Sequence, residues 1–96
     1  MKSRAEILKS LEKAKRELAQ QYAIRRLGLF GSYARGEQRE DSDVDVLIEV
    51  DPSIGLGFVD LAERLEELLG THVELVSTRA LKPRNRKIIE KDLVDV

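Results

Sequence analysis

The stretch from Gly31 to Asp45 combines residues that suit phosphate and metal chemistry. Gly31 and Ser32 stand together, and after ten intervening residues the chain reads Asp43-Val44-Asp45. Alternate residues of a β-strand point to one face, so the two carboxylates are predicted to lie side by side, with Cα atoms about 6.8 Å apart. Such a pair repels unless cations lie between its members, and Mg²⁺ or Mn²⁺ bound through oxygen fits the site. Two such ions about 3.5–4 Å apart would clamp a nucleoside triphosphate.

Two further features support this interpretation. Glycine at position 31 lets backbone N–H groups approach a phosphate closely, and the Ser32 hydroxyl is a donor for a phosphate oxygen. Glu74 lies between Val73 and Leu75 in an apolar segment. We expect it in the middle of a strand, where a buried carboxylate needs a partner, and a shared metal ion is one such partner.

The periodicity of the chain predicts the elements that position these residues. Apolar residues at steps of three and four predict helices over residues 4–22 and 57–69, and Pro83 predicts the start of a helix over 83–91. A short apolar run predicts a strand over 24–30, the β-branched run over 43–50 predicts a central strand, and 71–77 reads as a third strand. The stretch over 31–42 is predicted as a loop with at most one helical turn. The strand–helix–strand order favours parallel pairing of the last two strands. The fold class is α+β (α/β), a small mixed β-sheet with helices packed on it, in a single domain over residues 1–96.

The amino-acid composition excludes several classes of protein function. The chain has no cysteine, which excludes a thiol nucleophile and a disulfide scaffold and fits the cytoplasm. No apolar run is long enough to span a membrane, and no secretory signal is predicted. Aromatic residues make up only 4%, which argues against a surface for direct nucleic-acid binding. Tyr22 and Phe30 are assigned to the core.

Charge is distributed unevenly along the chain. Residues 1–40 carry a net charge of +5, residues 41–78 carry −9, and residues 79–96 carry +3. An acidic centre between basic flanks suits metal binding at the centre and attraction of phosphate or an acidic partner at the flanks. A chain of this size buries only a modest core, so binding to a partner or to a second copy would add stability.

The stretch GSYARGEQREDSDVDVLIEV resembles the motif of the minimal nucleotidyltransferase family, within the DNA polymerase β-like superfamily. The resemblance covers nearly the whole chain and implies a polymerase β palm-like core. It further implies that Gly31 and Ser32 hold the triphosphate of ATP, that Asp43 and Asp45 bind divalent metal, and that Glu74 is the third carboxylate. Family members often have aspartate at that third position. Arg35 and Arg39 are candidates for contacts with the outer phosphates or with a partner.

The resemblance implies transfer of AMP from ATP to an acceptor hydroxyl. Small members of the family resemble antitoxins encoded with HEPN-domain ribonuclease toxins, which they modify on a tyrosine. Two alternatives remain open on the sequence: an antitoxin that neutralises its toxin by binding alone, and a nucleotidyltransferase for a small molecule such as an aminoglycoside. The length of 96 residues weakens the second alternative because little chain is left for a separate substrate domain.

Overall fold

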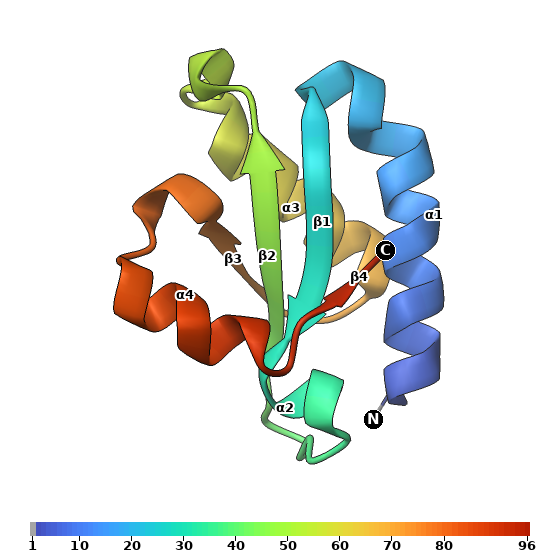
Figure 1. Cartoon of the computed structure of the whole chain (residues 1–96). Coiled ribbons are helices and arrows are strands. Elements are labelled where there is room, and N and C mark those ends of the chain that lie inside the picture. The colour runs from blue at the N-terminus through green and yellow to red at the C-terminus, as the bar shows by residue number, and fades with distance from the viewer. Residues whose placement is uncertain (1) are drawn as a thin grey trace.

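A four-stranded sheet with helices on both faces organises the chain (Figure 1). The structure is a computed structural model and describes residues 2–96. Its elements follow in the order α1 (Arg4–Tyr22), β1 (Ile24–Phe30), α2 (Gly31–Arg35), β2 (Val44–Val50), the 3-10 turn η1 (Pro52–Ile54), α3 (Gly57–Leu69), β3 (Val73–Ser77), the 3-10 turn η2 (Thr78–Ala80), α4 (Pro83–Glu90) and β4 (Val94–Asp95).

The long helix α1 begins and ends with recognisable local signals. Ser3 and Glu6 form a reciprocal capping box: the Ser3 hydroxyl accepts from the Glu6 backbone N–H, and the Glu6 carboxylate accepts from the Ser3 backbone N–H. The helix ends at Ala23, which is left-handed with φ 52°. One buried stripe faces the sheet, made of Ile7, Leu11, Ala14, Leu18 and Tyr22. No helix within residues 2–96 combines the length and apolar character needed to cross a membrane.

The strand order is β3-β2-β1-β4, which makes the sheet mixed as predicted. β1 and β2 are antiparallel neighbours, whereas β2 and β3 are parallel and are joined by α3. β4 adds to the other edge of β1 in antiparallel orientation. The fold therefore brings the ends of β1, β2 and β3 that carry the motif residues to one end of the sheet (Figure 1).

The two faces of the sheet differ in their covering. Val44, Val46 and Ile48 of β2 join the hydrophobic core that α1 and α3 contribute to. The alternate residues of β2, which include Asp45 and Glu49, lie on the opposite face. In Figure 1, α4 lies in front of this second face, and none of its residues is fully buried. The face that carries Asp45 is thus only partly covered.

The structure shifts several predicted boundaries by one or two residues. Strand pairing begins with Val44 and Val73, so β2 starts after Asp43 and β3 starts later than residue 71. The predicted loop over 31–42 opens with its one helical turn, α2. β4 was not predicted because two residues are too short to show an alternating pattern, and it exists through its pairing with β1.

Candidate active site

Gly31 marks the turn from β1 into α2 and lies directly against Asp45. Its φ of +74° is left-handed, a conformation in which L side chains are strained. A Cβ atom at this position would overlap the Oδ2 atom of Asp45 and lie 3.0 Å from its Cγ atom. Glycine is therefore required here on two grounds, and the Gly31 backbone and the Asp45 carboxylate are in close proximity.

Asp45 and Glu74 are register partners on the parallel strands β2 and β3. Neighbouring strands are about 4.8 Å apart, so side chains at matched positions on one face are adjacent. On its other side Asp45 pairs with Phe30, the last residue of β1. Asp43 precedes β2 by one residue and is half-buried, as Asp45 is. The structure thus places Asp45 and Glu74 at adjacent positions, with Asp43 directly before β2.

The pKa of Asp45 is shifted by its burial and by the neighbouring carboxylates. Partial burial raises the pKa of the Asp45 carboxyl above its ordinary value, and the negative charges of Glu74 and Asp43 raise it further. The positive charge of Arg35 acts in the opposite direction. A cation bound nearby would stabilise the charged form of this carboxylate.

The donor set fits a hard divalent cation in its chemistry, since all three groups offer carboxylate oxygen. Their side chains do not converge on one point: within residues 2–96, no three His, Cys, Asp or Glu groups are gathered closely enough to hold a metal ion. Mutual repulsion of like charges favours such a spread arrangement. The residues present therefore suit Mg²⁺ or Mn²⁺, provided that the side chains rotate toward the ion.

Glu74 departs from its predicted setting. It is the second residue of β3 and is exposed, whereas an internal, buried position was expected. The reason is topological: β3 is an edge strand of the sheet, and Glu74 lines the open hollow that residues of α4 also line. Its charge therefore needs no buried partner, and only the register of Glu74 with Asp45 supports a role in metal binding.

A hollow of about 300 Å³ opens at these two carboxylates. Asp45 and Glu74 contribute its acidic part, while the walls are mainly apolar and include Phe30, Val76, Leu81, Ile88 and Ile89. Phe30 is half-buried here, so its assignment to the core was wrong. The alternation in β1 explains this, because Leu27 and Leu29 face the core and Phe30 faces the opposite side. Tyr22 is buried in the core, as predicted.

Arg35 lies at the end of α2 and is held by two carboxylates. Its Nε atom donates to Oε1 of Glu37 at 3.0 Å, and its NH1 group donates to Oδ2 of Asp92 at 2.7 Å. Both interactions raise the pKa of Arg35, that of Asp92 more strongly. Sequence reasoning missed Asp92, since it lies 57 positions after Arg35 and no local pattern marks it. Arg39 is exposed beyond α2.

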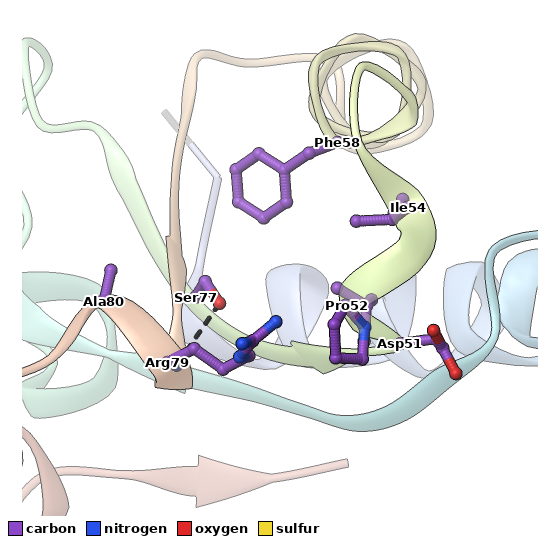
Figure 2. Close-up of a pocket in the computed structure, with 8 residues that line it drawn as sticks. Asp51, Pro52, Ile54, Phe58, Ser77, Arg79 and Ala80 are labelled. Atoms are coloured by element: carbon purple, nitrogen blue, oxygen red, sulfur yellow. Dashed lines mark hydrogen bonds between the residues drawn. The ribbon is translucent and has the colours of Figure 1, made fainter.

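A second hollow, of about 320 Å³, lies at the opposite end of β2 and β3 (Figure 2). Asp51, Pro52, Ile54, Phe58 and Arg79 line it, together with Ser77 and Ala80. Its one carboxylate, Asp51, already accepts from the backbone N–H and hydroxyl of Ser53 and pairs with Arg25 at 3.3 Å. This hollow lacks a group of carboxylates, so the candidate active site lies at the Asp45 end.

Comparison with known proteins shows the family of this chain. Residues 11–96 match the family model of the nucleotidyltransferase domain. Protein adenylyltransferase MntA of Thermococcus cleftensis is 44% identical over 95% of this chain and 93% of its own length. A protein of Methanocaldococcus jannaschii that is assigned the same activity is 42% identical, and both chains are covered completely.

Solved structures share the fold. One described as a minimal nucleotidyltransferase superposes with a TM-score of 0.85 at 33% identity, covering 99% of this chain and 97% of the other. More distant likenesses are a toxin–antitoxin complex with AMP-PNP, at TM-score 0.72 and 24% identity, and a Shewanella oneidensis complex of a tri-AMPylated HEPN toxin with its MNT antitoxin, at TM-score 0.59 and 18% identity. Each of these two covers 88% of this chain and 70% of the other. This chain is therefore a nucleotidyltransferase and belongs to the nucleotidyltransferase domain family.

Proposed function

We propose that this nucleotidyltransferase transfers AMP from ATP to a hydroxyl group of a partner protein. The observation that carries the proposal is the register of Asp45 with Glu74 beside the Gly31 backbone, at the open end of the sheet. The carboxylates can bind a cation. Gly31 has no side chain, so a phosphate can approach the backbone closely. The names of the relatives, which are protein adenylyltransferases, support a protein acceptor.

In the proposed reaction, the acceptor oxygen attacks the α-phosphorus of ATP. The new bond joins this oxygen to the adenylyl group, the bond from the α-phosphorus to the bridging oxygen of the β-phosphate breaks, and pyrophosphate leaves. The acceptor proton passes to a base at the site. Such transfer depends chiefly on positioning and on neutralisation of charge, so no covalent enzyme intermediate is needed.

We assign roles to the residues accordingly. Gly31 and Ser32 bind the triphosphate through backbone N–H groups and the Ser32 hydroxyl, and Arg35 contacts the outer phosphates. Asp43 and Asp45 would hold Mg²⁺ or Mn²⁺, with Glu74 as the third carboxylate. Ions held by these residues would neutralise phosphate charge and lower the pKa of the acceptor hydroxyl. Glu74 is also within the hollow where a hydroxyl would enter, so it is our candidate for the base.

The acceptor side of the site supports a macromolecular acceptor. The hollow at Asp45 and Glu74 is open, and α4 forms one of its walls. Exposed residues of α4, with the residue that follows it, form a stripe at the rim of this hollow that we call the α4 stripe, made of Arg84, Lys87, Ile88 and Lys91. All four are exposed, and Ile88 is 57% exposed although it is apolar. A basic stripe with an apolar centre beside the acceptor hollow suits an acidic protein segment.

We further propose that the partner is a HEPN-domain toxin and that this chain is its antitoxin. The support is the likeness in fold to the Shewanella oneidensis antitoxin that is bound to an AMPylated HEPN toxin. The acceptor is then a tyrosine hydroxyl of the toxin, as the family resemblance implies. The same fold also suits neutralisation by contact alone, and the experiment must separate the two modes.

The test uses the protein encoded by the adjacent gene as the acceptor. The chain, ATP and Mg²⁺ are incubated with this protein, and mass spectrometry locates any added adenylyl group. We expect AMP on a tyrosine of the partner, and no addition with the Asp43→Asn/Asp45→Asn variant, whose fold is checked by circular dichroism. Neutralisation of the partner by both chains without any added mass would instead establish the contact-only antitoxin. Transfer to an aminoglycoside but not to the partner would support the small-molecule alternative.

A further inference from the structure

The pair of Arg35 and Asp92 joins two parts of the chain that are far apart in the sequence. Arg35 ends the short helix α2 next to the phosphate-binding residues Gly31 and Ser32. Asp92 lies between α4 and β4. The NH1 group of Arg35 donates to Oδ2 of Asp92 at 2.7 Å, a short charge-assisted hydrogen bond. The Asp92 side chain is 26% exposed, whereas that of Glu37, the other partner of Arg35, is 63% exposed.

Asp92 is itself a fixed point, because the residues that follow it are held on β1. Val94 and Asp95 pair with Leu29 and Gly28, and the Val96 backbone N–H donates to the Leu27 carbonyl at 3.0 Å. Three more contacts hold the same segment: Arg26 donates twice to the Asp95 carboxylate, at 2.8 and 3.3 Å, Lys15 donates to the Val96 carbonyl at 2.6 Å, and the Leu93 side chain lies over Gly28, where a Cβ atom would be 2.7 Å from its Cδ1.

The guanidinium of Arg35 keeps binding capacity after these contacts. It has five N–H donors in a rigid fork. The Nε donor is used by Glu37 and one NH1 donor by Asp92, so three donors remain for a further anion. A long arginine side chain loses rotamer freedom when it binds, and holding it beforehand removes part of that cost.

We propose that Asp92 is a positioning residue, which holds the Arg35 guanidinium in the orientation that binds the outer phosphates of ATP. The inference rests on the proposed function, in which Arg35 contacts the triphosphate. Through Asp92, the segment over residues 92–96 becomes part of the nucleotide site although it touches no nucleotide itself. Asp92 also carries a negative charge near the phosphates, and loss of that charge alone would strengthen ATP binding. Loss of the positioning contact should therefore weaken ATP binding, whereas loss of the charge should strengthen it.

Two substitutions separate these effects in a calorimetric titration of the chain with ATP and Mg²⁺. Asp92→Ala removes the acceptor oxygen and the charge, and we expect ATP to bind about 2- to 10-fold more weakly, the range for one side chain that must be immobilised on binding. Asp92→Asn keeps an acceptor oxygen and removes the charge, so we expect affinity equal to or above that of the wild type. The matched control is Glu90→Ala, which breaks the surface ion pair with Arg86 two residues before Asp92 and leaves Arg35 held; its affinity should be unchanged.

A double-mutant cycle tests whether Asp92 acts through Arg35. Adding Asp92→Ala to an Arg35→Ala chain should have no further effect on ATP affinity. In steady-state transfer, the Asp92→Ala effect should fall on KM for ATP and leave kcat unchanged. Tighter ATP binding by Asp92→Ala, unchanged binding, or a full additional loss in the Arg35→Ala chain would each overturn the inference while the proposed function stands. A wild-type chain that binds no ATP would overturn both.

Discussion

Gly31 and Asp45 lie so close that any side chain at position 31 would overlap the Asp45 carboxylate. The turn that we propose to bind phosphate therefore lies directly against the Asp45 carboxylate. Asp45 is held at this place by its register with Phe30 on one side and Glu74 on the other. The three strands that meet here place the predicted motif residues at one end of the sheet.

Replacement of Gly31 by alanine should disrupt both stability and transfer. A left-handed backbone costs a non-glycine residue about 1–2 kcal/mol. Gly36→Ala is the matched control, since Gly36 has φ +71° and nothing lies within 4 Å of its added Cβ. Urea denaturation should show a loss of about 1–2 kcal/mol for Gly36→Ala and a larger one for Gly31→Ala. Displacement of the Asp45 carboxylate should also reduce AMP transfer about 100-fold in Gly31→Ala only. Equal behaviour of the two variants would show that the contact with Asp45 is unimportant.

Asp45 should make the protein less stable as the pH rises. Because burial and the neighbouring carboxylates raise its pKa in the folded state above the ordinary value of 3.8, the folded chain binds the proton more tightly than the unfolded chain. Unfolding free energy is therefore lost between that ordinary value and the raised one, and the loss persists at neutral pH. In EDTA at pH 7, Asp45→Asn should melt at a higher temperature than the wild type, and the difference should disappear near pH 3. A lower melting temperature at pH 7 would contradict this electrostatic account.

Glu74→Gln should damage turnover more than ATP binding. Glutamine keeps the volume and removes the charge, so Gly31, Ser32 and the other carboxylates still bind the triphosphate. Loss of a base or metal ligand on the acceptor side should lower kcat about 100-fold or more. The control is Glu63→Gln, an exposed carboxylate of α3, which should change neither value. Parallel losses in kcat and ATP affinity would assign Glu74 to the phosphate side, and no loss would remove it from the site.

The α4 stripe should control access of the protein acceptor. Arg84→Glu with Lys87→Glu reverses its charge, and we expect modification of the partner to slow about 10-fold at low salt with ATP affinity unchanged. The effect should shrink as the ionic strength rises. Lys13→Glu with Arg16→Glu makes the same charge change on the exposed face of α1 and serves as the control. Equal slowing by both pairs would indicate general attraction rather than a docking surface on α4.

The local patterns of the sequence predicted most of the fold and the composition of the candidate site. The stripe of α1, the alternation of β2 and the Gly70 end of α3 each depend on neighbouring residues, so the sequence displays them directly. Contacts between residues that are far apart in the sequence produce no such local pattern. The exposure of Glu74 depends on β3 being an edge strand, and the contact of Arg35 with Asp92 depends on β4 joining β1. Neither the exposure of Glu74 nor the contact of Arg35 with Asp92 can be predicted from a local sequence pattern. The first removes burial as a reason for a metal at Glu74, and the second adds Asp92 to the contacts of Arg35.

The most direct test of AMP transfer compares ATP labelled at the α-phosphate with ATP labelled at the γ-phosphate. Each is incubated with the wild-type chain, Mg²⁺ and the partner protein from the adjacent gene. We predict that α-label is bound covalently to the partner, that pyrophosphate is released in equal amount, and that no γ-label is transferred. The Asp43→Asn/Asp45→Asn chain should transfer neither label. Transfer of γ-label to the partner, or undiminished α-label transfer by a folded double variant, would contradict the account.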